Sequence, residues 1–215
     1  RNLDELILTK LEWQDWKEIA DSVQQALTDE VIEQAFTALP DTIATLTAEP
    51  IIRKLKSRRD DLPRIAQNYY NTLARQVQVV GSDKHERFEV EVTASNDVLV
   101  RMYKTLKDGE PQQLLLERVL HPSETTQLTL YGLNGDDTFV FKGNRKPPMK
   151  IKVWGGAGED QYRADNTAVA KRLYIYDTLY RNSLHVPKQA HVDLDNDQKA
   201  QNFDAEGWLL RYYLD

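Results

Sequence analysis

The chain of 215 residues contains no cysteine, which excludes disulfide bonds, thiolate zinc sites and thiol catalysis. This absence fits both the cytosol and the periplasm, so it does not choose a compartment. No stretch approaches the roughly 18 consecutive apolar residues of a membrane-spanning helix, so we expect no such span in this chain. Basic residues are outnumbered, 28 to 34, and the net charge of -6 argues against a nucleic-acid partner.

Histidine is scarce, and the four histidines lack the spacing of a metal-binding or catalytic cluster. They occur in no HxxxH, HxH or DxH arrangement, and no serine-nucleophile signature accompanies them. We therefore predict no catalytic residues and expect that this chain alone is not an enzyme. Because it begins at Arg1, we expect it to be part of a longer protein. The four histidines are His85, His121, His185 and His191.

The first 80 residues carry apolar side chains at helical spacing, and we predict about four helices over residues 3–80. Thr9 and Glu12 have capping-box spacing, which predicts the start of the first helix. Gly81 is expected to end the last helix, because glycine readily adopts positive φ. The helical region is thus expected to span residues 1–81. The face of the first helix that we expect to pack into a core comprises Trp16, Ile19, Ala20, Val23 and Leu27.

After Gly81 the hydrophobic period changes from that of a helix to the alternation of a strand. Residues 87–92, 96–103 and 113–120 form three such runs separated by short polar turns, a pattern typical of an antiparallel meander. Further short runs follow to the end. We therefore expect an α+β fold, in which residues 82–215 form a mostly antiparallel β-sandwich or a partial β-helix.

Two glycine-rich stretches resemble the calcium-binding nonapeptide of RTX proteins. GGAGEDQYR, residues 155–163, matches every position of that consensus, and GLNGDDTFV, residues 132–140, departs from it only at Leu133. In such turns backbone carbonyls and a carboxylate can coordinate Ca²⁺. The alternative is a pair of structural corners whose acids face water. The candidate calcium ligands are Asn134, Asp136, Asp137, Gly156, Gly158 and Asp160.

The separation between the two stretches bears on this choice. Gly132 and Gly155 are more than two nonapeptide lengths apart, closer to one coil of a β-helix than to tandem nonapeptides. Stacked corners would bring their acidic residues together, and the repulsion would require a cation or solvent. We also expect Gly155→Val to strain a turn that requires positive φ.

A second acidic segment, residues 193–204, has oxygen ligands at the first, third and fifth positions of an EF-hand loop. Gln198 stands where that loop needs glycine, and Asp204 stands where it needs a bidentate glutamate. We therefore predict a solvated acidic turn.

The order of several segments resembles one part of bacterial surface-antigen proteins. These segments are SRRDDLPRIAQNYYNTLARQVQVVGSDKHERFEV, LYGLNGDDTFVFKG, KIKVWGGAGEDQY, YDTLYRNSL and QNFDAEGWLLRYY. In those proteins this part lies between a calcineurin-like metallophosphoesterase and an outer-membrane barrel related to Omp85 and BamA. The resemblance covers about residue 51 to the end and implies a periplasmic or cell-surface location, associated with the outer membrane. The partners that it implies are the neighbouring domains of the same polypeptide.

Two functions remain open from the sequence. The first is a noncatalytic structural and interaction module of such an outer-membrane protein, with calcium as a candidate stabiliser. The second is an accessory region that completes or covers the active site of the attached metallophosphoesterase. Neither adds a phosphatase metal cluster to this chain, because no matching histidine and aspartate pattern occurs in it.

Overall fold

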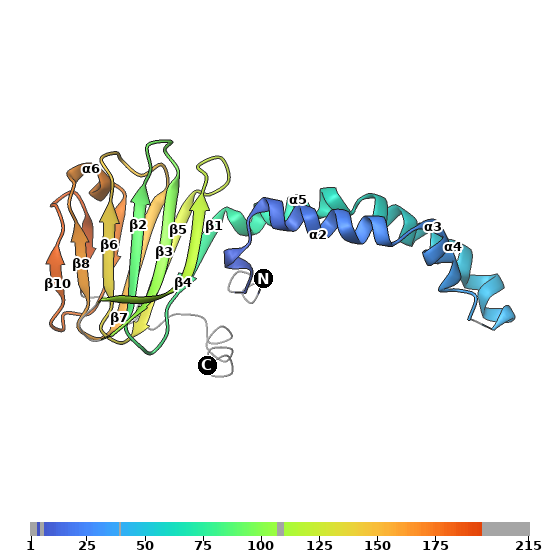
Figure 1. Ribbon diagram of the computed structural model, residues 1–215, viewed down its shortest axis with the longest axis horizontal. Coiled ribbons are helices and arrows are strands. Elements are labelled where there is room, and N and C mark those ends of the chain that lie inside the picture. Colours follow the sequence, from blue (N-terminus) through green and yellow to red (C-terminus); the bar gives the residue numbers. More distant parts are fainter. Residues whose placement is uncertain (1–3, 5–6, 39, 107–109, 195–215) are drawn as a thin grey trace. The chain divides into compact units, whose positions relative to one another are not determined.

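The computed structural model describes residues 4, 7–38, 40–106 and 110–194 (Figure 1). The chain divides into two compact units: residues 11–72, which are helical, and the remainder, which is built mainly of strands. The expected EF-hand-like turn lies almost wholly outside the described residues, as does the carboxy-terminal segment of the family resemblance. No helix within the described ranges combines the length and apolar character needed to cross a membrane.

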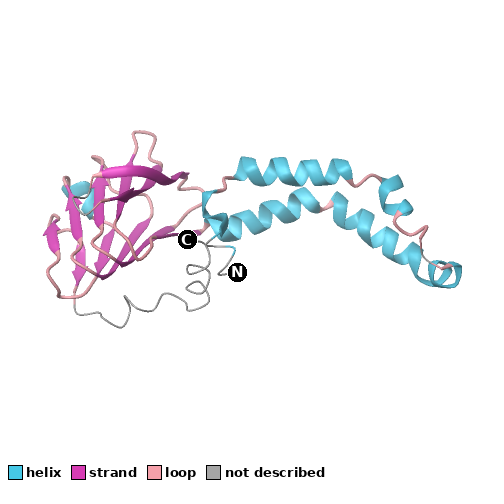
Figure 2. Cartoon of the chain, turned by 60° about the horizontal axis from the view of Figure 1, so that its bottom comes forward, coloured by secondary structure: helices cyan, strands magenta, loops and turns pink. Residues whose placement is uncertain are grey.

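The helical unit consists of two antiparallel arms (Figure 2). Aromatic rings tie the arms together, because Trp13 lies 5.7 Å from Tyr70 and Trp16 lies 5.8 Å from Tyr69 between ring centroids. At the other end of the pair, Lys56 binds carboxylates of the facing arm. The first arm contains α2 (Trp13–Ala26) and α3 (Asp29–Gln34), and the second contains α4 (Asp41–Asp60) and α5 (Leu62–Ala74).

The other unit contains two β-sheets. The first is parallel, with the order β1 (Gln76–Val80), β5 (Gln127–Asn134), β7 (Lys150–Ala157), β9 (Leu173–Tyr176) and β11 (His191–Asp193). The second is mixed, with the order β10 (Ser183–His185), β8 (Gln161–Ala164), β6 (Thr138–Lys142), β2 (Glu86–Val92), β3 (Val98–Thr105) and β4 (Pro111–Leu120). Two short helices complete the unit, η1 (Leu8–Lys10) and α6 (Thr167–Ala170).

The strands alternate between the two sheets along the chain, so that each pair forms one coil. The pairs are β1 with β2, β5 with β6, β7 with β8, and β9 with β10. The hairpin of β3 and β4 is inserted after the first pair and extends the second sheet. Each coil pairs in parallel with the next, and Gln127 of β5 has Lys150 of β7 as its register partner, the same separation as between Gly132 and Gly155. Inward-facing apolar side chains of both sheets form one core, including Val79, Leu130, Val153, Ile175, Phe88, Phe139 and Tyr162.

The expected α+β class with a mostly antiparallel β domain is wrong. The structure is α/β, with one parallel and one mixed sheet. Among the described strands, only the predicted meander is antiparallel, as β2, β3 and β4 show. Elsewhere, a short polar turn leads from one sheet into the other instead of back along the same sheet. Local alternation of apolar and polar residues is the same in both cases.

Two local predictions in the helical region are also wrong. The helix expected to reach Gly81 ends at Ala74, and residues 76–80 form β1. The capping box at the start of α2 joins Glu12 to Asp15, whose carboxylate accepts a hydrogen bond from the Glu12 amide at 2.8 Å. The Thr9 hydroxyl donates to the Gln78 carbonyl instead.

Candidate functional site: the stacked acidic corners

Four corners of equal length lead from the first sheet to the second and lie in register on one another. Each has eight residues: GSDKHERF at 81–88, GLNGDDTF at 132–139, GGAGEDQY at 155–162 and DTLYRNSL at 177–184. The sixth position is acidic or an amide in every corner, and the eighth is a large apolar residue. The two stretches recognised in the sequence are therefore the middle members of a set of four.

The sixth positions form a buried ladder of hydrogen bonds between coils. The amide of Glu86 donates to Asp137 Oδ1 at 2.7 Å, and the amide of Asp137 donates to Asp160 Oδ1 at 2.8 Å. The amide of Asp160 in turn donates to Asn182 Oδ1 at 2.8 Å. Each side chain thus satisfies a buried backbone donor of the preceding coil, which would otherwise cost about 1–3 kcal/mol.

The second oxygens of two carboxyl groups in this ladder are buried without a hydrogen-bond partner among the described residues. These atoms are Asp137 Oδ2 and Asp160 Oδ2, and each of the two residues is only 1% exposed. Burial, followed by the nearby charge of Asp177, raises the pKa of Asp160 to about 8. Burial, followed by the charge of Asp160, raises the pKa of Asp137 well above its ordinary value. At neutral pH the Asp160 carboxyl group retains its proton, because an unpaired buried charge is unfavourable.

A third buried carboxyl group, that of Asp177, joins this row from the first position of the fourth corner. Its Oδ2 accepts a hydrogen bond from the Tyr162 hydroxyl at 2.5 Å, and its Oδ1 accepts one from the Thr178 amide at 2.7 Å. Burial raises the pKa of Asp177, although the hydrogen bonds from Tyr162 and Thr178 oppose the rise. Burial also raises the pKa of the Tyr162 hydroxyl well above its ordinary value, so that hydroxyl stays protonated and acts as a donor.

The eighth positions extend the stacking into the core. The rings of Phe88 and Phe139 are stacked with centroids 4.8 Å apart, and those of Phe139 and Tyr162 with centroids 5.1 Å apart. Leu184 occupies this position in the fourth corner and packs on the same core. Each corner therefore contributes a hydrogen-bonded polar residue at its sixth position and a packed apolar residue at its eighth. A shift of one coil in register would break both the hydrogen bonds and the apolar packing.

The fifth positions form a second row at the surface. The amide of Asp136 donates to His85 Nδ1 at 2.9 Å, and the amide of Glu159 donates to Asp136 Oδ1 at 3.0 Å. Arg181 then donates to Glu159 Oε1 at 3.0 Å. In this row the side chain of one coil accepts from the next coil, the reverse of the buried ladder.

We expect Asp136→Ala to lower the free energy of unfolding by less than about 1 kcal/mol, because its bond to the Glu159 amide is exposed and water can replace it. Urea unfolding of the variant and the parent chain measures this difference. A loss of about 1–3 kcal/mol, the cost of a buried donor left without its acceptor, would show that the surface row holds the coils together as strongly as the buried ladder does.

The structure brings the predicted calcium ligands to two neighbouring corners. Asn134 donates to the Asp83 carboxylate of the preceding coil. Gly156 and Gly158 adopt φ of 113° and 155° and lie close to backbone atoms of Leu133 and Gly135. Together with the bonds of Asp136, Asp137 and Asp160, these contacts show that every predicted ligand takes part in stacking one coil on another.

No set of three or more histidine, aspartate or glutamate side chains in the described ranges is arranged to hold a metal ion. The unpartnered oxygens of Asp137 and Asp160 are nevertheless carboxylate oxygens, the type that Ca²⁺ prefers. The type of donor atom thus suits calcium. The two corners, however, bring together fewer unpartnered carboxylate oxygens than the six to eight oxygens that calcium usually takes.

Sequence reasoning missed Glu86, Asp177 and Asn182. Lys84 stands in the first corner where the middle corners have glycine, and Asp177 itself replaces the first glycine of the fourth corner. The glycine consensus therefore skips both outer corners. The spacing between an acid or amide at position six and a large apolar residue at position eight was the available signal.

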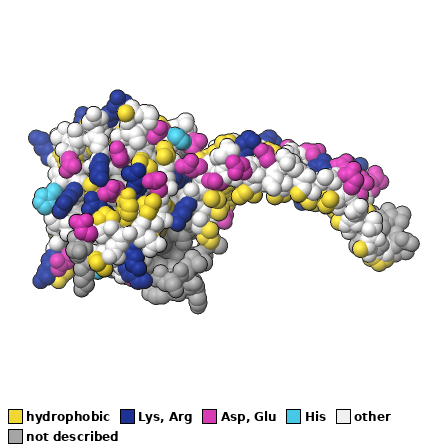
Figure 3. Space-filling model, in the orientation of Figure 1, with side chains coloured by type: hydrophobic (Ala, Val, Ile, Leu, Met, Phe, Trp, Pro, Cys, Tyr) yellow, Lys and Arg dark blue, Asp and Glu magenta, His cyan; other side chains and the backbone are white. Residues whose placement is uncertain are grey.

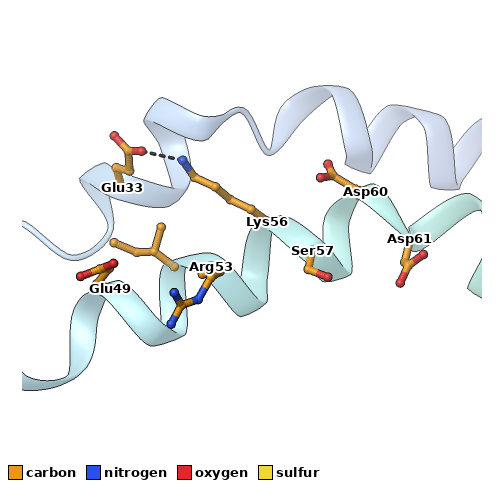
Figure 4. Close-up of a pocket in the computed structure, with 8 residues that line it drawn as sticks. Glu33, Glu49, Arg53, Lys56, Ser57, Asp60 and Asp61 are labelled. Atoms are coloured by element: carbon orange, nitrogen blue, oxygen red, sulfur yellow. Dashed lines mark hydrogen bonds and ion pairs between the residues drawn. The ribbon is translucent and has the colours of Figure 1, made fainter.

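The helical unit has an open depression of about 600 Å³ between α3 and α4 (Figure 4). Lys56 extends across it from α4 and binds Glu33 at 2.6 Å and Asp29 at 2.9 Å. Arg59 adds a third ion pair to Asp29 at 2.6 Å. Lys56 and Arg59 thus have acidic partners in the facing arm, and these ion pairs join the two arms.

The chain matches no protein-family model, no curated protein and no solved structure. The geometry of the stacked corners is therefore the basis for its functional interpretation.

Proposed function

We propose that this chain is a noncatalytic structural and interaction module. The observation that carries the proposal is the buried ladder through Glu86, Asp137, Asp160 and Asn182, which links four successive coils. Asp137, Asp160 and Asp177 are at most 1% exposed, so they do not meet solvent or a substrate. Such burial favours a role in holding the coils together over a role in chemistry.

We further propose that the module belongs to a periplasmic or surface-associated outer-membrane protein, where it connects a metallophosphoesterase to a barrel. The order of the glycine-rich corners and their flanking segments supports this context by resemblance. A stack of coils locked by side-chain ladders suits a spacer, because its length follows from the number of coils. The neighbouring domains of the same polypeptide are its proposed partners.

A calcium-stabilised form of the module is the second candidate, and the unpartnered Oδ2 atoms of Asp137 and Asp160 favour it. Buried carboxyl groups without partners require either protons or a cation to neutralise them. Protons and calcium predict different responses of the folded state, so one experiment separates them.

Thermal unfolding of the 215-residue chain in EDTA and in millimolar CaCl₂ tests which of them is present. If protons neutralise the buried carboxyl groups, we expect the same melting temperature within about 1 °C in EDTA and in CaCl₂, since a ligand stabilises only the state that binds it. A rise with calcium that Asp137→Asn/Asp160→Asn abolishes, and that the exposed control Asp165→Asn retains, would establish the calcium-stabilised form.

The noncatalytic role is tested by incubating the same chain with an aryl phosphate and Mn²⁺. We expect no hydrolysis above that of buffer with Mn²⁺ alone. Hydrolysis that scales with protein concentration and survives further purification would overturn the proposal.

A further inference from the structure

The helical unit presents a stripe of exposed apolar side chains along one side, and hydrophobic side chains gather along one edge of that unit in Figure 3. The stripe residues of the first arm recur every four positions, and those of the second arm form two pairs with the same spacing. All are between 37% and 59% exposed. The stripe comprises Ile19, Val23, Leu27 and Val31 from the first arm and Ile51, Leu55, Ile65 and Tyr69 from the second.

Both halves of the stripe face the same way. In each arm an exposed stripe residue directly precedes a buried one: Ile19 precedes Ala20, and Tyr69 precedes Tyr70. Successive residues of an α-helix are rotated by about 100° around its axis, so each stripe residue points about 100° away from the buried residue that follows it. This rotation has the same sense along the chain in both arms. Because the arms run antiparallel, it directs the stripe residues of both arms to the same side of the pair.

The arms carry opposite charge. Residues 11–38 contain seven acidic and one basic side chain, a net charge of -6, whereas residues 40–72 contain four acidic and six basic ones, a net charge of +2. The whole unit is therefore acidic, which disfavours an anionic lipid surface as the occupant of the stripe. The stripe instead lies between an acidic and a basic border.

We propose that this stripe binds the same stripe of a second copy of the chain. A twofold axis parallel to the arms lays the acidic arm of one copy on the basic arm of the other and yields four packed helices. The stripe exposes on the order of 700 Å² if each fully exposed residue presents roughly 200 Å², close to the ~800 Å² per partner of a standard interface. This association is independent of the corners and of the function proposed for them.

The mass of the chain in solution tests the proposal. In light scattering or sedimentation at increasing concentration, we expect the 24.9 kDa chain to reach twice that mass. Ile19→Glu/Leu55→Glu should raise the dissociation constant at least tenfold, because it places charge in the apolar stripe. Leu179→Glu, at a site 73% exposed and outside the stripe, should leave the dimer intact. Circular dichroism checks that both variants remain folded.

The orientation of the two copies is tested by cross-linking, since the chain has no cysteine of its own. Separately tagged Val31→Cys and Leu55→Cys chains are mixed and oxidised. The proposed axis predicts a disulfide between differently tagged chains, and preferential pairing of Val31→Cys with itself would overturn it.

A chain that stays monomeric at all concentrations would overturn the proposal, as would a dimer unaffected by the glutamates. Flotation of a monomeric chain with neutral phosphatidylcholine vesicles would assign the stripe to a lipid surface instead.

Discussion

Gly155→Val is expected to lower the free energy of unfolding by at least about 3 kcal/mol, because side-chain atoms already occupy the space that its Cβ needs. A Cβ at Gly155 would lie 2.5 Å from Asp160 Oδ2 and from Asp177 Oδ2, and closer still to the Tyr162 hydroxyl. These groups cannot easily move aside. The Asp160 carboxyl group accepts a hydrogen bond from the Asp137 amide. The Tyr162 ring is stacked on that of Phe139, and its hydroxyl donates a hydrogen bond to Asp177.

The reason for this effect differs from the one expected from the sequence. The positive φ values in this corner belong to Gly156 and Gly158, so strain of the Gly155 backbone is not the cause. Ala157→Val is the matched control, because Ala157 lies in the same strand with an exposed side chain. We expect the control to change stability by less than about 0.5 kcal/mol in urea unfolding. Equal stability of Gly155→Val and the parent chain would show that the three polar groups do not meet at this point.

Features set by local sequence were predicted with most success. The three strands between residues 86 and 120 alternate apolar and polar residues and are joined by short turns, and they pair antiparallel as expected. The helical periodicity also identified most of the helical unit, but the prediction that Ile19, Val23 and Leu27 face a core is wrong, because these side chains are exposed. The end of α5 was missed because Val77 continues the helical stripe, although it belongs to a strand in the core. Burial against strands of other coils decided its conformation.

The parallel stacking could not be read from any single segment. The partners of Gln127 are Gln76 in the preceding coil and Lys150 in the following one, and short-range patterns carry no information on such distant pairings. The candidate site was predicted in part, because the middle corners contain the glycines that a consensus recognises. The side chains that link corners to one another became apparent only from the register. Asp177 is the clearest case, since its carboxyl group accepts a hydrogen bond from the Tyr162 hydroxyl of the preceding coil.

The parent chain is expected to become less stable as the pH rises from about 5 to 8. The folded state holds a proton on Asp160 up to a pKa of about 8, whereas the unfolded chain releases it near the ordinary value of 3.8. Between these values the folded state binds more protons, so stability falls by up to roughly 1.4 kcal/mol per pH unit for each such group. The contribution is fully present below the unfolded pKa and is lost as the pH rises through the folded pKa.

Other carboxylates do not obscure this window. Hydrogen bonds or ion pairs lower the pKa of four of the described ones, so their stabilisation is present above the ordinary pKa and is lost only as the pH falls below about 4. These four are Asp29, Glu30, Glu89 and Asp97. A decline in the free energy of unfolding between pH 5 and 8 therefore reports on groups whose pKa is raised in the folded state. Among these, Asp160 is chosen for substitution.

Asp160→Asn is expected to flatten this pH dependence and to be several kcal/mol more stable than the parent chain at pH 8. The amide keeps an Oδ1 acceptor for the Asp137 amide and cannot ionise, as Asn182 shows one coil later. Asp160→Ala is the contrasting variant: it leaves the buried Asp137 amide without its acceptor and should lose about 1–3 kcal/mol even at pH 5. Urea unfolding of the three chains from pH 5 to 8 measures both effects. If Asp160→Asn retained the full slope, or were less stable than the parent chain at pH 8, the folded state would not hold its proton at Asp160. A calcium-dependent loss in the asparagine variant would then identify the ion as the group that neutralises the row.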